Sequence, residues 1–430
     1  MRMQYNIVSN EIASGMTSDV EAEIHYKWNF TVNIIEGIVY FFGLNISSFS
    51  TILPAYADKF TDSNFIISLI PAVMTLGFSL PQILSSGYTR GLKRKKRFVI
   101  IFGIPQRVSW LILAIATFFL AKGNPKLMLI LFFLCYATYT LSTGIIIPTW
   151  AEFIATIIPQ KKRGRFSGYR NFFGSGLGVL AAMSANYILK TVPHPHNFAF
   201  CFFLTALFCI SAMPIFALSK EVPYLKPRDT GKLRNYFKRL PNILFNDHNY
   251  SKYLLVTILF TFQAMVNVFY TIYAIRKLQV TDAQIAIFTG VILASQAVSN
   301  IFWGYLADKK GHKTIIVISM LSASISPIIA LIANSFFVYC GVFVFLGFSY
   351  GARAVSGFNI LFEFAPDDDK ATYVSLTNTL TAPFSGLSPI LGGLLADLFG
   401  YEFIFALSPG IGLVALFMLA FWVKEPRNLK

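Results

Sequence analysis

Long apolar stretches alternate with short polar ones along the whole chain. A helix needs about 20 apolar residues, at about 1.5 Å rise each, to cross a hydrocarbon core about 30 Å thick. The pattern therefore predicts an all-α polytopic membrane protein with twelve transmembrane helices. These predicted spans cover 30–52, 64–86, 98–121, 127–150, 167–189, 198–219, 252–275, 283–305, 314–334, 336–359, 372–397 and 402–423.

The polar segment 220–251 divides the chain into two halves of six predicted spans each. It holds three prolines and a cluster of lysines and arginines, which is typical of a loop outside the membrane. Within it, a short surface helix is expected near Leu233–Leu240. The predicted organisation is an N-terminal tail, a six-helix bundle, a central linker, a second six-helix bundle and a C-terminal tail, at 1–29, 30–219, 220–251, 252–423 and 424–430.

Charge is sparse and unevenly placed. Only 13% of the residues are charged and 55% are hydrophobic, whereas ordinary soluble domains have about 25% charged residues. The net charge of +16 would suit nucleic acid, but the basic residues lie in short loops between apolar stretches, which argues against that partner. Most of them fall on one side of the predicted topology, including the clusters at 90–97 and 161–165. Because lysine and arginine accumulate in cytoplasmic loops, both termini are predicted to be cytoplasmic, in a cell (plasma or inner) membrane protein.

One short loop combines glycine with charge. The ten residues Gly304–Lys313 join two apolar stretches and include Asp308 and Gly311. Glycine has no Cβ, so it permits backbone angles and close helix approaches that other residues disfavour. The loop resembles the G-x-x-x-D-(R/K)-x-G-(R/K)-(R/K) motif of the major facilitator superfamily, with His312 at a position that is usually basic.

A weak internal repeat extends this resemblance. The segments 159–171 and 366–378 precede the fifth and eleventh predicted spans, and each has proline first, then a basic residue, an aromatic residue and asparagine at matching positions. With the division into two sets of six spans, the chain resembles the major facilitator superfamily over nearly its whole length. The resemblance implies two six-helix bundles related by a pseudo-twofold axis normal to the membrane.

The same resemblance implies a cytoplasmic gate motif made of Gly304, Asp308, Gly311, Lys313 and Arg353. In the first half, serine and isoleucine stand where the second half has the acid and the arginine, so the two charges occur together in one half only. An Asp308–Arg353 ion pair is a natural explanation, and Asp308 is expected to hold the cytoplasmic side closed against the start of the fifth span. The alternative is that Arg353 lies near the membrane surface and extends its charge to water.

Two charged residues lie deep in the predicted spans. Glu36 and Arg107 lie about 12 and 15 Å inside the first and third spans, at about 1.5 Å per residue. An isolated charge at such depth costs at least about 2.5–3.5 kcal/mol, so we expect the two to pair or to face a wet cavity. Glu36 is a candidate for ion coupling, and a purely structural Glu36–Arg107 pair is the alternative.

Polar side chains recur on one face of the first and seventh predicted spans. Their spacings, i, i+3, i+7 and i, i+4, i+7, place side chains on one side of a helix. The resemblance implies that these spans line a central substrate cavity, and these side chains would suit a hydroxylated or amphipathic solute. Hydrogen bonds between helices are the alternative use of such a face. The candidate cavity residues are Asn33, Glu36, Tyr40, Gln263, Asn267 and Tyr270.

A secondary transporter, either a symporter or an antiporter, is the function that these features favour. It would move a small solute across the bilayer by alternating access, as a monomer, with protons or another ion as coupling partner. No cofactor, metal site or catalytic constellation is predicted, because the five histidines lie in tails or loops, the four cysteines lie in apolar stretches, and no nucleotide-binding phosphate loop occurs. A transporter-like receptor or sensor is one alternative, and a polytopic membrane enzyme is another.

Overall fold

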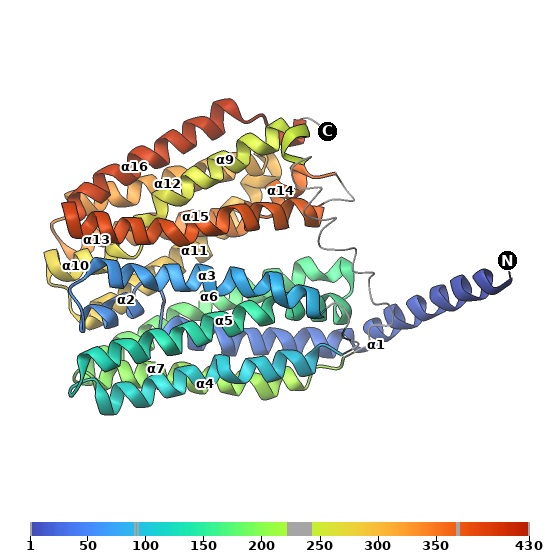
Figure 1. Ribbon diagram of the computed structural model, residues 1–430, viewed down its shortest axis with the longest axis horizontal. Helices are drawn as coiled ribbons and strands as arrows, with labels where there is room; N and C mark the ends of the chain where they lie inside the picture. The colour runs from blue at the N-terminus through green and yellow to red at the C-terminus, as the bar shows by residue number, and fades with distance from the viewer. Residues whose placement is uncertain (1, 90–91, 93, 222–242, 367–369, 429–430) are drawn as a thin grey trace.

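The computed structural model consists of long helices that lie side by side along one axis (Figure 1). It describes residues 2–89, 92, 94–221, 243–366 and 370–428. Within that part of the chain, twelve helices are long and apolar enough to cross a membrane, which confirms the predicted number of spans. The described residues form no strand. The surface helix expected near Leu233–Leu240 lies outside the described residues.

The helices divide into two sets, on either side of the central polar segment. The N-terminal half contains α1 (Arg2–Ile46), α2 (Ile52–Asp58), α3 (Asn64–Thr89), α4 (Lys96–Leu120), α5 (Pro125–Ile157), α6 (Gln160–Thr191) and α7 (His196–Ala217). The C-terminal half contains α9 (His248–Gln263), η1 (Ala264–Val266), α10 (Phe269–Leu278), α11 (Asp282–Lys310), α12 (His312–Ile332), α13 (Phe336–Ser356), α14 (Asn359–Phe364), α15 (Lys370–Phe399), α16 (Tyr401–Phe417), η2 (Met418–Trp422) and η3 (Pro426–Asn428).

Two of these boundaries matter for the site. The seventh predicted span is interrupted, since η1 separates α9 from α10. Between the fourth and fifth spans, α5 ends at Ile157 rather than at 150, and α6 begins at Gln160 rather than at 167. Residues expected near the membrane surface at the start of the fifth span therefore lie well inside a helix.

Helix starts and turns follow from local sequence. Asn124, Asp247 and Thr281 precede α5, α9 and α11, and each side chain accepts a hydrogen bond from a backbone N–H of the first turn. Gly311 alone separates α11 from α12, with φ at +86°. Glycine adopts that conformation at low cost, so this turn requires the second glycine of the predicted gate motif.

Most helix packing occurs within each half, and two seams join the halves. The seams are formed by α3 along α15 and by α6 along α11. Both chain termini lie at one end of the molecule, on the right in Figure 1, which is named the terminal end here. At the opposite end, named the far end, the short helix α2 contacts α10 and α11. The cavity described below lies between these two seams and these two ends.

Candidate functional site

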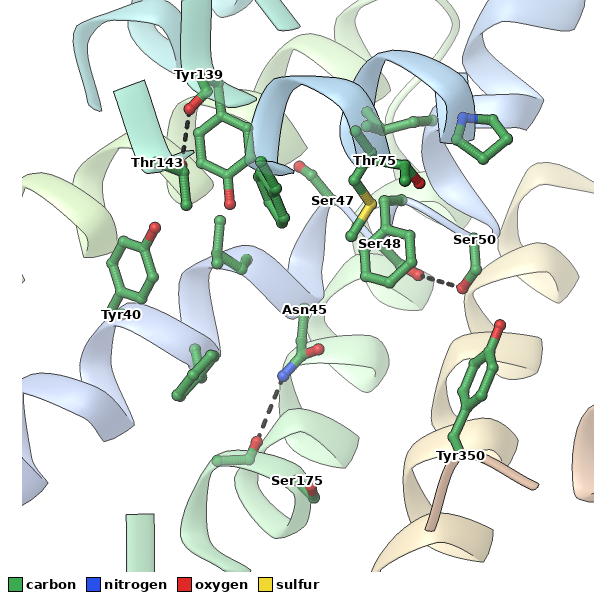
Figure 2. Close-up of a pocket in the computed structure, with 18 of the residues that line it drawn as sticks. Tyr40, Asn45, Ser47, Ser48, Ser50, Thr75, Tyr139, Thr143, Ser175 and Tyr350 are labelled. Atoms are coloured by element: carbon green, nitrogen blue, oxygen red, sulfur yellow. Dashed lines mark hydrogen bonds between the residues drawn. The ribbon is translucent and has the colours of Figure 1, made fainter. Parts of the chain in front are cut away.

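A large cavity lies between the two halves. Its volume is about 1010 Å³, and both halves contribute side chains to its wall. Figure 2 shows part of that wall, where hydroxyl and amide side chains of the N-terminal half lie across from Tyr350 of α13. Such a wall can bind a solute that combines apolar rings with hydrogen-bonding groups. The aromatic residues that line the cavity are Tyr40, Phe41, Phe49, Phe78, Trp110, Tyr136, Tyr139, Trp150, Phe216 and Tyr350.

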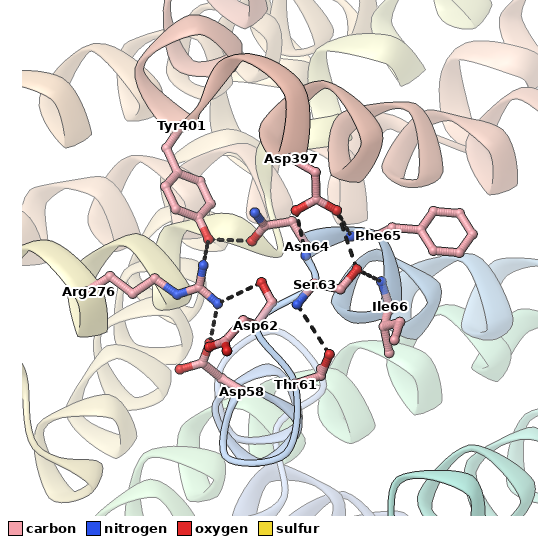
Figure 3. Close-up of polar contacts among 10 residues, drawn as sticks. All are labelled: Asp58, Thr61, Asp62, Ser63, Asn64, Phe65, Ile66, Arg276, Asp397 and Tyr401. Atoms are coloured by element: carbon pink, nitrogen blue, oxygen red, sulfur yellow. Dashed lines mark hydrogen bonds and ion pairs between the residues drawn. The ribbon is translucent and has the colours of Figure 1, made fainter. Parts of the chain in front are cut away.

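Two ion pairs join the halves at the far end. Lys59 Nζ lies 2.8 Å from Asp282 Oδ1. Arg276 Nη2 donates a hydrogen bond to Asp58 Oδ1, also at 2.8 Å (Figure 3). In each pair, one partner lies in or beside α2 and the other lies in the C-terminal half. The second pair continues into the C-terminal half, because Arg276 Nη1 donates to the hydroxyl of Tyr401 at 2.7 Å.

A carboxylate of the C-terminal half caps the first turn of α3. Asp397 of α15 accepts hydrogen bonds from the backbone N–H of Asn64 at 2.9 Å and of Phe65 at 3.0 Å, and from the hydroxyl of Ser63 at 3.3 Å (Figure 3). The start of a helix carries a partial positive charge, which favours a carboxylate there. This cap and the two ion pairs are together named the far-end gate, made of Asp58, Lys59, Ser63, Asn64, Phe65, Arg276, Asp282 and Asp397.

The far-end gate explains why the structure is asymmetric along its long axis. Within the described part of the chain, the hydrogen bonds and ion pairs that join the two halves lie toward the far end. At the terminal end, no hydrogen bond or ion pair between described residues links the halves. The cavity is therefore closed at the far end in this structure.

The carboxylate of Glu36 is paired inside the N-terminal half. Arg170 Nη2 lies 3.0 Å from Glu36 Oε2, and both side chains are largely buried. The Arg170 guanidinium also lies over the rings of Trp150 and Phe41, at 4.4 and 5.2 Å from their centroids, in a cation–π arrangement. Gly37 makes room for this arginine, because a Cβ there would lie 2.8 Å from Arg170 Cγ. The pair is thus held in place by α1, α5 and α6 at the cavity wall.

Arg107 does not pair with Glu36, so of the two expectations, an ion pair or a place at a cavity, this structure has the second. Its Nε donates to the carbonyl oxygen of Cys209 at 2.7 Å, and its Nη1 donates to Gln106 Oε1 at 2.8 Å. The guanidinium carbon lies 5.3 Å from the ring centroid of Tyr40. Depth alone places the two charges at similar levels, but helix rotation turns them toward different neighbours. Both residues do line the cavity.

Three of the six predicted cavity residues line the cavity, namely Glu36, Tyr40 and Asn267. Figure 2 shows Tyr40 on α1, on the same side of the cavity as Tyr139 and Thr143 of α5. The Tyr40 hydroxyl accepts a hydrogen bond from Gln106 at 2.9 Å. The polar face of the first span therefore does reach the cavity over part of its length.

The other three predicted cavity residues pack between helices instead. Asn33 Nδ2 donates to Ser219 Oγ at 2.9 Å, which ties α1 to the segment after α7. Gln263 Nε2 donates to the carbonyl oxygen of Ala323 at 2.8 Å, which ties α9 to α12. Tyr270 is fully buried among aromatic rings of the C-terminal half. These three residues therefore serve helix packing, which is the alternative use of a polar face.

The predicted gate motif contacts the C-terminal segment. Arg427 donates to the carbonyl oxygen of Asp308 at 3.0 Å, and Lys313 Nζ donates to a carbonyl of η2 at 2.9 Å. Gly311 lies against Glu425, since a Cβ at this position would be 3.0 Å from the carboxylate. Burial raises the pKa of the Glu425 carboxyl, and the nearby Lys313 ammonium opposes that shift.

The expected Asp308–Arg353 ion pair is absent from the contacts of the described residues. Asp308 is exposed. Arg353 lines the cavity, with its guanidinium carbon 5.7 Å from the ring centroid of Phe260. Gly304 has no neighbour within 4 Å of its missing Cβ, so no close helix approach explains that glycine. No hydrogen bond or ion pair of described residues links Asp308 to α6 either, and a latch at the terminal end stays a prediction.

Sequence reasoning missed Arg170, because the predicted fifth span began at 167 and placed this residue near the membrane surface. Since α6 begins at Gln160, Arg170 lies about 15 Å into the helix. The internal repeat contained a signal, because Arg170 occupies the position of Thr377 in the second segment. Thr377 Oγ1 lies 2.8 Å from the hydroxyl of Tyr250, in the first helix of the C-terminal half. The equivalent partner in the N-terminal half is the first helix, α1, which carries Glu36.

Comparisons with known proteins agree with this architecture. Residues 253–430 match the sequence model of the Major Facilitator Superfamily. The structure of a D-xylose-proton symporter has a TM-score of 0.69 to this chain, covering 93% of this chain and 98% of the symporter at 15% identity. The C-terminal part of the chain is thus similar in sequence to the Major Facilitator Superfamily. The nucleoside transporter NupG shares the major facilitator fold, with a TM-score of 0.67 over 91% of this chain and 98% of NupG at 12% identity.

A curated relative matches this chain over a shorter region. The multidrug resistance protein MdtL of Klebsiella pneumoniae subsp. pneumoniae is 28% identical over 153 residues, which is 35% of this chain and 39% of MdtL. The chain thus spans about two fifths of the length of the curated relatives that it matches. The structural likenesses, at 15% and 12% identity, show the fold alone.

Proposed function

We propose that this chain is a secondary transporter that moves a small solute by alternating access. The observation that supports this most directly is the cavity of about 1010 Å³ between two halves that are joined at the far end. A cavity closed by ion pairs at one end suits a protein that exposes one site to two sides of a membrane in turn. The moving units are the bundles predicted at 30–219 and 252–423, with 220–251 as the linker between them.

The terminal end faces the cytoplasm in this proposal. Both termini and the lysine- and arginine-rich segments lie on that side of the predicted topology, and such segments are retained in the cytoplasm. The described conformation is then closed toward the outside of a cell membrane. Figure 3 shows the contacts that would have to break before a solute could enter or leave from outside.

Coupling to protons is assigned to the Glu36–Arg170 pair. Glu36 is the one carboxylate among the described residues that line the cavity. A proton that binds to Glu36 would remove the charge that holds Arg170 at 3.0 Å and would free the guanidinium to move.

A receptor or sensor with the same fold is the second candidate. The contacts of Asp308 and Lys313 with the C-terminal segment favour a receptor, because they connect that segment to a helix turn of the C-terminal half. Such a protein could bind its ligand without exposing the cavity to both sides. Accessibility of the cavity from each side therefore separates the two functions.

The test uses single cysteines in a variant that lacks the native thiols. Ser50→Cys places a thiol on the cavity wall beside the far-end gate. Pro193→Cys and Arg94→Cys are controls, since both residues are exposed and lie outside the membrane spans, in the loop between α6 and α7 at the far end and before α4 at the terminal end. A membrane-impermeant maleimide is applied to intact cells and, separately, to inverted membrane vesicles.

Alternating access predicts that the thiol at position 50 reacts from both sides. The control at position 193 is expected to react only in intact cells, and the control at position 94 only in inverted vesicles. A thiol at position 50 that reacts from one side only, with both controls behaving as expected, would contradict transport and favour the receptor.

A further inference from the structure

We infer that the solute is an amphipathic organic anion, held by Arg107 and Arg353 against the aromatic wall of the cavity. This inference rests on the proposed transport function and names its substrate class. It comes from the charges and the unpaired polar atoms of the cavity wall.

The charge inventory of the cavity is positive. Its charged lining residues, within the described part of the chain, are one glutamate and three arginines: Glu36, Arg107, Arg170 and Arg353. The carboxylate of Glu36 is already paired with Arg170 at 3.0 Å. Two arginines therefore remain without a carboxylate partner. Charges removed from water are normally paired, so the buried Arg107 lacks the anion that its surroundings call for.

Arg107 is buried, and its hydrogen bonds go to neutral acceptors only. Its Nε and Nη1 donate to backbone carbonyls and to Gln106 Oε1. Its Nη2 makes no hydrogen bond with another described residue. A guanidinium carries donors in a planar fork that fits a carboxylate or a phosphate group. The hydrogen bonds of Nε and Nη1 thus fix the orientation of the Arg107 guanidinium, and Nη2 is available to a ligand.

Arg353 provides the second positive charge from the opposite half. Its side chain is exposed to the cavity, its guanidinium makes no hydrogen bond with a described residue, and the guanidinium carbon lies 5.7 Å from the ring centroid of Phe260. Since α13 begins at Phe336 at the far end, Arg353 lies near the terminal end of that helix. Arg107 lies near the middle of α4. An anion that enters from the terminal end would therefore meet Arg353 first and Arg107 deeper in the cavity.

The remaining wall favours an apolar or aromatic body on this anion. Trp110, Tyr136, Tyr139 and Trp150 all line the cavity. Trp110 is almost completely buried, and its Nε1 has no hydrogen-bond partner among the described residues. Inorganic phosphate could satisfy the arginines, but it would leave this aromatic wall unused.

Three ligands of the same shape and different charge test the inference. Naphthoate is the anion, naphthamide is the neutral isostere and naphthylmethylammonium is the cation, and inorganic phosphate is an anion without a ring. Each is added to the purified full-length protein, and the melting temperature is recorded against ligand concentration, because a ligand that binds the folded state raises it. We expect naphthoate to bind about tenfold more tightly than naphthamide, as a charge-assisted hydrogen bond adds to the shared ring contacts. Neither the cation nor inorganic phosphate should reach that affinity.

Two arginine variants and a control locate the effect. Arg107→Gln should lose the preference for naphthoate over naphthamide, and Arg107→Lys should keep part of it. Arg353→Gln should weaken the same preference from the other half. Arg163→Gln is the control, because Arg163 also donates to backbone carbonyls but lies outside the cavity. If Arg107→Gln does not fold, the preference for naphthoate over naphthamide is still measured in the unmodified protein and in Arg353→Gln. Those two measurements then test whether the cavity binds an anion.

Different results would contradict the anion assignment and the proposed transport function. A preference for the neutral or cationic ligand, or a naphthoate preference that survives both Arg107→Gln and Arg353→Gln, would overturn the anion assignment and leave transport intact. Naphthoate binding that depends on the arginines, in a protein whose position 50 is accessible from one side only, would support the anion site and contradict transport.

Discussion

The far-end gate makes a quantitative prediction through Asp397. Its carboxylate accepts two backbone N–H bonds at the start of α3, at 2.9 and 3.0 Å, and one hydroxyl bond from Ser63. Asp397→Asn keeps the shape and one acceptor oxygen, but it removes the charge and turns an amide NH₂ toward a donor. A charge at a helix N-terminus contributes about 0.3–1 kcal/mol at an exposed position. Asp397 is exposed, so we expect a loss of about 1 kcal/mol including the lost hydrogen bond.

That loss applies only to the conformation in which the gate is closed. The halves must separate at the far end to open the cavity there, which breaks the bonds between α15 and α3 whatever residue stands at 397. A loss of about 1 kcal/mol from one state shifts the ratio of two states about fivefold. The variant should therefore expose the cavity to the outside about five times more often.

The assay is the rate at which an impermeant maleimide labels Ser50→Cys from outside in intact cells. When the open state is the minor one, that rate is proportional to its population, so Asp397→Asn should raise it about fivefold. Glu402→Gln is the matched control, because Glu402 lies at the same end and accepts a hydrogen bond from Tyr273, within its own half. Equal labelling rates for the Asp397 and Glu402 variants would show that the cap does not hold the gate closed.

Three further predictions follow from the glycines and the loops. Gly37→Ala should separate Glu36 from Arg170 and lower the melting temperature as strongly as Glu36→Gln does. The variant that carries both substitutions should have a melting temperature only slightly below that of either single variant. Gly176→Ala is the control and should change the melting temperature little, because a Cβ at this position meets nothing within 4 Å. Gly311→Ala should reduce the free energy of unfolding by about 1–2 kcal/mol because of its positive φ, while Gly304→Ala should not; equal effects would argue against a required turn. An impermeant maleimide should label Pro193→Cys in intact cells and Arg94→Cys only in inverted vesicles. Labelling of Arg94→Cys in intact cells would refute the predicted topology.

The number of membrane helices could be predicted from the sequence because hydropathy is a local property. A stretch such as 314–334 must cross the membrane whatever its neighbours are, and α12 indeed covers His312–Ile332. The break in the seventh span at η1 could not be read in this way, since the residues on both sides of it are apolar. Hydropathy reports how deep a residue lies, and it does not report the local backbone conformation.

The candidate site was only partly predictable for a related reason. The depth of Glu36 and Arg107 follows from counting residues, but the direction in which each side chain points depends on how neighbouring helices are rotated. Arg170 reaches Glu36 only because α6 begins earlier than hydropathy suggested and because Gly37 leaves room for it. Polar faces have the same ambiguity. Asn33 and Tyr40 lie on one face of α1, yet Asn33 bonds to Ser219 between helices and Tyr40 lines the cavity.

The two halves use one position of the repeat for different chemistry. In the N-terminal half, Arg170 of α6 reaches back to Glu36 of the first helix and forms an ion pair. In the C-terminal half, Thr377 occupies the equivalent position and shares a neutral hydrogen bond with Tyr250 of its own first helix. A hydroxyl pair has no charge to lose near neutral pH, so at this repeat position only the N-terminal half has an ion pair that a proton would break. The C-terminal half joins the same two helices through a carboxylate at another position, since the Tyr373 hydroxyl donates to Asp247 Oδ2 at 3.0 Å, and it supplies Asp397, Arg276 and Asp282 to the gate.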